Sequence, residues 1–442
     1  MKSRLRAFLD RLFRRDDGVS RLLKNSTPLF AAETWVFAAH VVEGFIVARF
    51  LGAANYGIIA LIVSFVTIVN QILDFRVHET ATRYTAEFLA ANEREKAVAA
   101  IKLCYIIDAA TGVLAFITIV LAAGPAARHI LHQPAAAPLI VWYAVRLLFS
   151  TADNTSHALL GVLGRFTWFS AVHIVTTMLE LAVVSFLVWA GFGIKGVIAG
   201  YVAASLASSI SFFSFALLAF SRAGLTAYRS APLSLLAPRA AEMGRFLVST
   251  NINELFVLII RNADILVLGY FRAPREVGYY RLAKSFVSIF GLISSPLYRA
   301  VYPQLSSLWH AGAKIEFRNV IRRSTKLVAA AVIAAAIIIT ILIPPVIHFT
   351  VGDAFMPSVS AIRIMAWGMA IPTIFYWTRP ALLAMGKAGF LTAANAISVL
   401  ITILLSLALV PEFGYKASAW LFMAPYLISH TMIINKYLGD AY

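Results

Sequence analysis

Residues 24–65 read KNSTPLFAAETWVFAAHVVEGFIVARFLGAANYGIIALIVSF, and a related stretch lies 221 residues further along the chain. No gap is needed to align the two copies. The identical pairs are Glu33 and Glu254, Val36 and Val257, Phe50 and Phe271, Gly57 and Gly278, Leu61 and Leu282, Ser64 and Ser285, and Phe65 and Phe286. At the same displacement, Phe192-Gly193-Ile194-Lys195 aligns with Phe413-Gly414-Tyr415-Lys416. The chain is therefore a tandem repeat of two halves.

The composition around this repeat is that of a membrane protein. Of 442 residues, 60% are hydrophobic and 13% are charged, and the mean hydropathy is +0.81. A membrane-spanning helix needs roughly 20 apolar residues. Such segments are predicted at 27–48, 56–75, 98–123, 136–160, 166–190, 194–220, 246–269, 277–302, 327–350, 358–384, 388–410 and 415–436. We expect an all-α fold of about twelve transmembrane helices.

Each half holds an even number of spans, so both halves enter the membrane from the same side. Such a parallel repeat is related by an axis along the membrane normal. It predicts two six-helix lobes around a central cavity. The predicted divisions are a basic amphipathic tail (1–26), a first lobe (27–220), a linker (221–245) and a second lobe (246–442).

The positive charge has a topological explanation. In this arrangement 25 of the 38 Lys and Arg residues lie on the side of the two termini, which the positive-inside rule assigns to the cytoplasm. The net charge of +17 therefore needs no nucleic-acid partner. The basic tail is expected either to lie on the anionic inner surface of the membrane or to be solvated.

Charged residues inside a membrane usually face a cavity or a partner, because burying them in lipid is costly. The first span carries Glu33, His40 and Glu43, whose spacing places them on one stripe of a helix. The repeat aligns these three with Glu254, Arg261 and Asp264. Both stripes are expected beside the central axis, although Arg261 and Asp264 can also neutralise each other within the second lobe.

Further candidates come from other spans. In the fourth span, Arg146, Ser150, Asp153, Asn154 and His157 would share one face of a regular helix, and the Arg146 guanidinium suits a phosphate. Arg281 and Lys284 point either inward to an anionic head group or outward to the membrane surface. The acids Asp108 and Glu180 lie near the middle of the membrane. The ion-coupling candidates are Glu33, Glu43, Asp108, Asp153, Glu180, Glu254 and Asp264.

The sequence carries no motif of an enzyme, of a metal site or of ATP hydrolysis. No cofactor is expected. The identity of the coupling ion stays open. A single acid with a raised pKa would favour a proton, whereas clustered acids together with backbone oxygens would favour a sodium ion. The only cysteine, Cys104, lies inside an apolar segment.

The stretch Ala48–Gly57, ARFLGAANYG, resembles the ARxLGxxxYG stretch of bacterial polysaccharide transporters. Weaker likenesses are Arg83-Tyr84-Thr85-Ala86-Glu87, the stretch from Gly269-Tyr270-Phe271 to Val277-Gly278-Tyr279-Tyr280, and Tyr302-Pro303-Gln304-Leu305. Together they cover both halves. The chain is similar to Wzx-type flippases, within the MOP superfamily that also holds multidrug (MATE) exporters and lipid II flippases.

This resemblance implies that two lobes move an undecaprenyl-pyrophosphate-linked oligosaccharide from the cytoplasmic to the outer leaflet by alternating access. The candidates for contact with the substrate are then Arg146, Arg261, Arg281, Lys284 and His40. A polysaccharide polymerase is an expected partner by analogy. Two alternatives stay open: an exporter of organic cations, and a membrane scaffold for glycan-assembly enzymes.

Overall fold

Helices make up every regular element of the computed structural model, which describes residues 17–75 and 77–441. Side chains are described for these residues except 17–31, 252–261, 292, 293, 295, 296, 299, 300, 388 and 438–441. The first lobe holds α2 (Asp17–Leu73), α3 (Val77–Ala90), α4 (Arg94–His129), η1 (Pro134–Ala136), α5 (Ala137–Ala144), α6 (Arg146–Phe149), η2 (Ser150–Ala152), α7 (Asp153–Val162), α8 (Phe166–Trp189) and α9 (Gly193–Arg222). The predicted helix in the tail lies outside the described residues.

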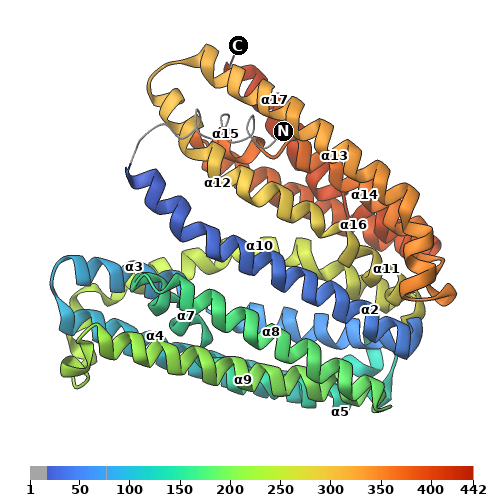
Figure 1. Ribbon diagram of the computed structural model, residues 1–442, viewed down its shortest axis with the longest axis horizontal. Coiled ribbons are helices and arrows are strands. Elements are labelled where there is room, and N and C mark those ends of the chain that lie inside the picture. The colour runs from blue at the N-terminus through green and yellow to red at the C-terminus, as the bar shows by residue number, and fades with distance from the viewer. Residues whose placement is uncertain (1–16, 76, 442) are drawn as a thin grey trace.

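The second lobe is built in the same order. After η3 (Leu225–Tyr228) and η4 (Leu233–Arg239) come α10 (Ala240–Phe271), α11 (Pro274–Val287), α12 (Ile289–His310), α13 (Lys314–Thr350), η5 (Asp353–Phe355), α14 (Ser358–Ile374), α15 (Thr378–Ala384), α16 (Ala388–Leu421) and α17 (Ala424–Ala441). In Figure 1 the first lobe is coloured blue to green and the second yellow to red. The lobes meet at the right of that view and diverge towards the left.

The predicted spans fall on these helices. Eight described segments are long and apolar enough to cross a membrane, and those in α2 and α16 contain bends at Gly52 and Gly414 that each separate two predicted spans. The remaining spans fall on α10, on α11 with α12, and on α17. The prediction of an all-helical membrane protein with two lobes is confirmed. The exact divisions at residues 26, 220 and 245 stay predictions.

Large apolar side chains cover the outside of both lobes, as expected of helices that face lipid. On α13, Ile338 and Ile341 are more than half exposed, at 56% and 64%. Trp189 and Trp420 are exposed at 71% and 61%, each near a predicted membrane boundary. Tryptophan is enriched at the interface between membrane and water. This surface agrees with a multi-pass membrane protein.

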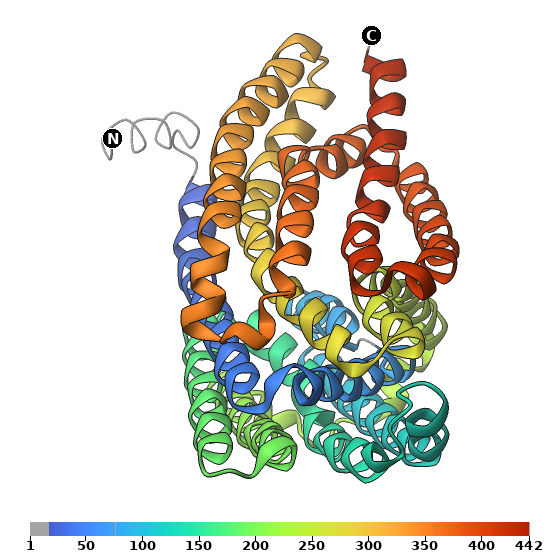
Figure 2. The ribbon, with the colours of Figure 1, turned by 90° about the vertical axis from the view of Figure 1, so that its right-hand side faces the viewer.

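The two lobes meet along α2 and α11, which lie between the two groups of helices in Figure 2. A Cβ atom at Gly57 would lie 1.8 Å from the carbonyl oxygen of Pro274. Conversely, a Cβ atom at Gly278 would lie 2.1 Å from the carbonyl oxygen of Ala53. Since the repeat aligns Ala53 with Pro274 and Gly57 with Gly278, the contact is reciprocal. We call it the inter-lobe seam, and only glycine allows this approach of the two backbones.

The rest of the Ala48–Gly57 stretch strengthens the seam. Gly52 has φ 72°, a conformation that favours glycine, and it bends α2. Arg49 Nη1 donates to the carbonyl oxygens of Phe349 and Thr350, at 2.7 and 2.9 Å. These two carbonyls belong to the end of α13 in the other lobe. The stretch that resembles polysaccharide transporters therefore both bends α2 and joins the two lobes.

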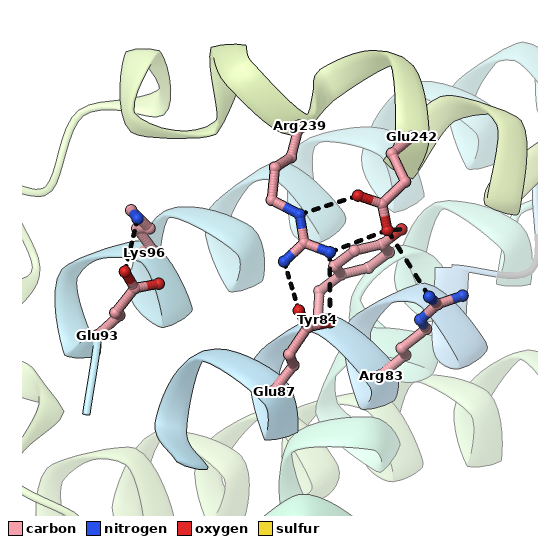
Figure 3. A network of polar contacts seen from close by, with 7 residues as sticks. All are labelled: Arg83, Tyr84, Glu87, Glu93, Lys96, Arg239 and Glu242. Atoms are coloured by element: carbon pink, nitrogen blue, oxygen red, sulfur yellow. Dashed lines mark hydrogen bonds and ion pairs between the residues drawn. The ribbon is translucent and has the colours of Figure 1, made fainter. Parts of the chain in front are cut away.

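A cluster of polar contacts joins the segment between the lobes to α3 of the first lobe (Figure 3). In Figure 1, α3 lies at the end of the molecule opposite to α11. Arg239, at the end of η4, donates to both carboxylate oxygens of Glu242, at 3.0 and 2.9 Å, and also to Glu87 of α3. The hydroxyl of Tyr84 donates to Glu242 over 3.1 Å, and Arg83 lies 3.7 Å from the same carboxylate. We call these five residues the linker cluster. Through them the start of α10 is held on α3.

The linker cluster predicts a dependence of stability on pH. The hydrogen bonds from Arg239 hold the pKa of Glu242 below its usual value. A carboxylate whose pKa is lowered on folding stabilises the protein above its usual pKa, and that contribution is lost as the pH falls. We therefore expect Glu242→Gln to lower the melting temperature of the purified protein at neutral pH. The difference from wild type should narrow as the pH falls through the range in which glutamate titrates.

Glu93→Gln is the matched control for this measurement. The Glu93 carboxylate accepts a hydrogen bond of 2.7 Å from the ammonium of Lys96, which lies three residues further along the chain. Such exposed local pairs contribute little to stability. A Glu242→Gln protein that melts like wild type at neutral pH would contradict a fastening role for the linker cluster.

Candidate functional site

A cavity of about 590 Å³ lies between the helices of the first lobe and α11 of the second. This volume is in the range of small-molecule sites, roughly 300–1,000 Å³. Its charged or imidazole-bearing lining consists of His40, Glu43, Arg146, Asp153, His173, Glu180, Arg281 and Lys284. Its hydroxyl-bearing lining consists of Tyr56, Tyr143, Thr176, Thr177, Tyr201, Ser205, Ser208, Ser285 and Ser288. Cations, carboxylates and hydroxyl groups thus face one space inside the predicted membrane region.

An interrupted helix carries two of the charged residues into this cavity. The segment from Pro134 to Val162 breaks into α5, α6, η2 and α7. At the break, the amide of Val145 donates to the carbonyl of Trp142 over 3.2 Å, a short three-residue turn. Ser205 Oγ of α9 donates to the carbonyl oxygen of Arg146 over 3.5 Å, at the long limit for a hydrogen bond. Interrupted helices within a membrane are tolerated where they line a cavity, and they commonly form binding sites.

The interruption corrects the polar stripe predicted for the fourth span. Arg146 and Asp153 line the cavity, as expected. Asn154 instead turns to Asp108, with 3.3 Å between its amide nitrogen and the carboxylate. The ring of His157 packs on Phe212, with 4.2 Å between ring centroids. Ser150 donates to the carbonyl oxygen of Leu147 over 3.3 Å and is not part of the lining either. The prediction of one continuous stripe is therefore wrong for Ser150, Asn154 and His157, since the helix is not regular between Arg146 and Asp153.

Arg146 is held by an aromatic partner and not by an acid. Its Nη1 donates to the hydroxyl of Tyr143, and its guanidinium lies over the same ring, 5.1 Å from the centroid. The ring of Tyr201 lies 6.0 Å from that of Tyr143. Arg146 forms no ion pair with any carboxylate of the described chain. Its remaining N–H groups are therefore available to an anionic ligand.

Arg281 faces the same cavity from the second lobe. Its guanidinium lies near the hydroxyl of Tyr56, and it is close enough to Glu43 and His40 to act on them electrostatically. It forms no ion pair with a described carboxylate either. Of the two orientations left open for Arg281, the structure has the inward one. One guanidinium from each lobe thus lacks an acidic partner in the shared cavity.

Three acids complete the lining. Glu43 is only 4% exposed, and its Oε2 has no hydrogen-bond partner among the described residues. The same holds for Oδ1 of Asp153. Glu180 Oε1 lies 4.0 Å from Nε2 of His40. A buried carboxylate oxygen without a donor is costly, so these acids call for a proton or another cation.

Lys284 reaches from the cavity into the second lobe. Its ammonium donates to both carboxylate oxygens of Asp264, at 2.9 and 2.8 Å. The hydroxyl of Tyr280 donates to Oδ2 of Asp264 over 2.5 Å. Asp264 borders a much smaller space of about 50 Å³. Lys284 is therefore already engaged by an acid of its own lobe.

The other predicted site residues lie elsewhere. Asp108 is buried outside the cavity, where it accepts hydrogen bonds from the amide and the hydroxyl of Thr155, at 3.0 and 2.5 Å. Glu33 is exposed and is not part of the cavity lining. The side chains of Glu254 and Arg261 lie outside the described residues. The cavity thus brings together seven of the twelve predicted residues, namely His40, Glu43, Arg146, Asp153, Glu180, Arg281 and Lys284.

The sequence analysis missed the aromatic and hydroxyl-bearing part of the lining. Tyr143 and Tyr201 lie in apolar segments, where an aromatic side chain is typical of a core or of the membrane interface. Thr176 and Thr177 precede Glu180 by about one helical turn, so they share its side of α8. That spacing was the one signal available for them.

The fold is similar to solved membrane transporters at low sequence identity. A multidrug resistance MATE family transporter of the MOP superfamily, in an inward-facing conformation, has a TM-score of 0.73 and 12% identity over 91% of this chain and 94% of its own. The lipid II flippase MurJ, in an inward closed conformation, has a TM-score of 0.72 and 14% identity over 93% and 87%. A MOP superfamily transporter from Pyrococcus furiosus has a TM-score of 0.64 and 13% identity over 94% of each chain.

These similarities define the class: the protein is a multi-pass membrane protein with the fold of the MOP superfamily. The family follows from the sequence. Residues 46–360 match the family described as polysaccharide biosynthesis protein, and the chain belongs to that family. The resemblance drawn from the Ala48–Gly57 stretch is confirmed. No curated protein matches the chain.

Proposed function

We propose that this protein is a flippase for undecaprenyl-pyrophosphate-linked oligosaccharides in the bacterial inner membrane. The observation that carries the proposal is the pair formed by Arg146 and Arg281, which face one cavity from opposite lobes and form no ion pair with a described carboxylate. A pyrophosphate that crosses a membrane needs fixed cations along its route. A guanidinium group can donate two parallel hydrogen bonds to the oxygens of one phosphate. Membership of the polysaccharide biosynthesis protein family supports the same substrate class.

The remainder of the lining suits a sugar. The hydroxyl groups of serine, threonine and tyrosine residues donate and accept hydrogen bonds, and carboxylates accept them from sugar hydroxyls. Tyrosine rings offer flat apolar surfaces for the faces of sugar rings. We propose that the oligosaccharide occupies this cavity while the polyprenyl chain remains in lipid. MurJ, which has a similar fold, is described as a lipid II flippase.

The direction of transport rests on the predicted topology. If the termini are cytoplasmic, the inter-lobe seam lies at the outer face and the lobes diverge towards the cytoplasm (Figure 1). Such a conformation is inward-facing, the name given to the similar MATE transporter. We propose that the lobes then rock about the central axis and release the substrate to the outer leaflet. We propose that an ion gradient drives this cycle without a bound cofactor, and that polysaccharide polymerases act on the product.

An exporter of organic cations is the second candidate, because MATE multidrug transporters share the fold. The guanidinium groups of Arg146 and Arg281 offer donors to phosphate oxygens, which an organic cation lacks, and this favours the flippase. For the transporter from Pyrococcus furiosus, a reversed polarity of the binding pocket suggests a different function. The polarity of the cavity is therefore a useful discriminator within this fold. A membrane scaffold, the third candidate, would have no use for a polar cavity.

Deletion of the gene tests these candidates. We expect one undecaprenyl-pyrophosphate-linked oligosaccharide to accumulate in the deletion strain, as measured by mass spectrometry of extracted lipids, and to disappear when the gene is restored. Growth in toxic organic cations is the parallel measurement. Unchanged lipid-linked saccharides together with new sensitivity to the cations would assign the protein to drug export instead.

A further inference from the structure

Two arginine side chains share one tryptophan ring at the end of the first lobe that the positive-inside rule assigns to the cytoplasm. Arg165 immediately precedes α8, Trp168 lies in the first turn of α8, and Arg222 is the last residue of α9. The guanidinium carbons of Arg165 and Arg222 each lie 5.0 Å from the centre of the Trp168 ring. This distance is that of a cation–π contact, so the ring holds both guanidinium groups close together. We call these three residues the tryptophan site.

Neither guanidinium of the tryptophan site has an acidic partner in the described part of the chain. No ion pair and no side-chain hydrogen bond joins Arg165 or Arg222 to a described residue. The Nε atom of Arg165 is buried and has no acceptor among these residues. A buried donor without an acceptor is costly, and two neighbouring positive charges repel each other. The site therefore needs an anion that does not belong to the described chain.

The linker cluster is a useful comparison, because it also places an arginine on an aromatic ring at the cytoplasmic end. The guanidinium carbon of Arg239 lies 5.2 Å from the centre of the Tyr84 ring. There the chain itself supplies the negative charge, since Arg239 pairs with the carboxylates of Glu87 and Glu242. The tryptophan site holds two cations in a similar setting and has no carboxylate from the described residues. Its counter-charge must come from another molecule.

An apolar surface extends from the tryptophan site towards the middle of the membrane region. Phe215 and Leu218 precede Arg222 by seven and four residues, a spacing that places all three on the same side of α9. Phe215 and Leu218 are 37% and 41% exposed. The ring centroids of Phe215 and Trp168 are 5.7 Å apart. A molecule with an anionic head and an apolar chain fits this combination better than a soluble anion does.

We propose that the tryptophan site binds the phosphate group of an anionic phospholipid from the cytoplasmic leaflet, with an acyl chain lying along Phe215 and Leu218. A guanidinium can donate two parallel hydrogen bonds to one phosphate, and the anionic lipids of this leaflet attract arginine residues near its surface. Arg94 of α4 adds positive charge close by, since its Nη1 would lie 3.6 Å from a Cβ atom at Gly224. None of the three residues of the tryptophan site lines the cavity, so this site is separate from the candidate transport site.

Binding of defined lipids to the purified full-length protein in detergent tests the proposal. We expect dioleoylphosphatidylglycerol to raise the melting temperature with saturation and to remain bound in native mass spectrometry. Dioleoylphosphatidylcholine, whose phosphate is balanced by its own choline group, should do neither. In the double variant Arg165→Gln/Arg222→Gln, half-maximal stabilisation should need about tenfold more phosphatidylglycerol or more, because the charged donors to the phosphate are lost.

Arg229→Gln/Arg245→Gln is the matched control, because it removes the same charge from two exposed arginines near the same end of the molecule. This control should respond to phosphatidylglycerol like the wild type. A wild type that shows no preference for phosphatidylglycerol, or an Arg165→Gln/Arg222→Gln variant that responds like the wild type, would overturn the proposal. If the double variant does not fold, Arg222→Gln alone should weaken the response, and an unchanged response would overturn the site.

Sodium pyrophosphate distinguishes a membrane lipid from a soluble phosphate compound. Pyrophosphate lacks an acyl chain, so we expect that it does not displace phosphatidylglycerol, and that any stabilisation it gives persists in Arg165→Gln/Arg222→Gln. Stabilisation by pyrophosphate that this variant loses would assign the tryptophan site to soluble phosphates and would overturn the lipid assignment. No oligosaccharide is present in these measurements, so their outcome is independent of the flippase function.

Discussion

Replacement of Gly57 by alanine is expected to abolish transport while the amount of protein in the membrane stays close to that of the wild type. The new Cβ would lie 1.8 Å from the carbonyl oxygen of Pro274, which is backbone and cannot turn aside. Overpacking of this kind costs about 1–3 kcal/mol. Separation of the lobes at the inter-lobe seam relieves the clash. Gly278→Ala should act in the same way, because the seam is reciprocal.

Transport can be measured as restoration of normal lipid-linked saccharide levels in the deletion strain. Opening of the seam can be followed with Ser285→Cys, a cavity position, and a thiol reagent that does not cross the membrane. The native Cys104 is buried. We expect labelling from outside to be faster when Gly57→Ala is also present than with Ser285→Cys alone. Gly124→Ala is the control, since a Cβ there has no neighbour within 4 Å. Normal transport by Gly57→Ala would contradict the role of the seam.

Replacement of Arg146 by alanine is the second change with a large expected effect. Hydrogen bonds to a charged group contribute about 1.5–3 kcal/mol, so loss of the guanidinium should weaken substrate binding about 10- to 100-fold. The lipid-linked oligosaccharide should accumulate as it does in the deletion strain. Arg146→Lys should restore transport only in part, because an ammonium cannot make the paired hydrogen bonds of a guanidinium.

Arg128→Ala is the matched control, because Arg128 is exposed at the end of α4, away from the cavity. Tyr143→Phe removes only the hydroxyl that holds Arg146 and should have a smaller effect than Arg146→Ala. Levels of folded protein are to be compared by size-exclusion chromatography. A folded Arg146→Ala variant that transports normally would refute the proposal that Arg146 binds the pyrophosphate. That result would favour a membrane scaffold.

Much of the fold could be predicted from the repeat and from the apolar segments. Because the two copies align without a gap over residues 24–65, the two parallel lobes follow from one displacement of 221 residues. The close approach of Gly57 and Gly278 was not predicted, because it depends on how the lobes pack. The positions of His40 and Glu43 in the cavity also follow, since charged residues inside a membrane turn away from lipid. The orientation of Arg281 could not be chosen from the sequence, because a side chain one turn inside a span can also reach the membrane surface.

The interruption of the fourth span could not be predicted. Its break near Arg146 contains no proline or glycine, and Ser205, which contacts the Arg146 carbonyl oxygen there, comes from another helix. The ion pair between Lys284 and Asp264 could not be predicted either, because it is a contact between two helices. Both residues were assigned to the cavity by their charge, but a distance of 2.8 Å between them depends on how α10 and α11 pack. Contacts between helices are not encoded in the spacing along one helix.

The most direct test of the central claim is the leaflet in which the lipid-linked oligosaccharide accumulates when the gene is deleted. Spheroplasts of the deletion strain can be treated with a glycosidase that does not cross the membrane, and the lipid extract can then be analysed by mass spectrometry. We expect the accumulated oligosaccharide to resist the enzyme in intact spheroplasts and to be cleaved after lysis. Cleavage in intact spheroplasts would place the substrate already outside and would contradict a flippase function for this protein.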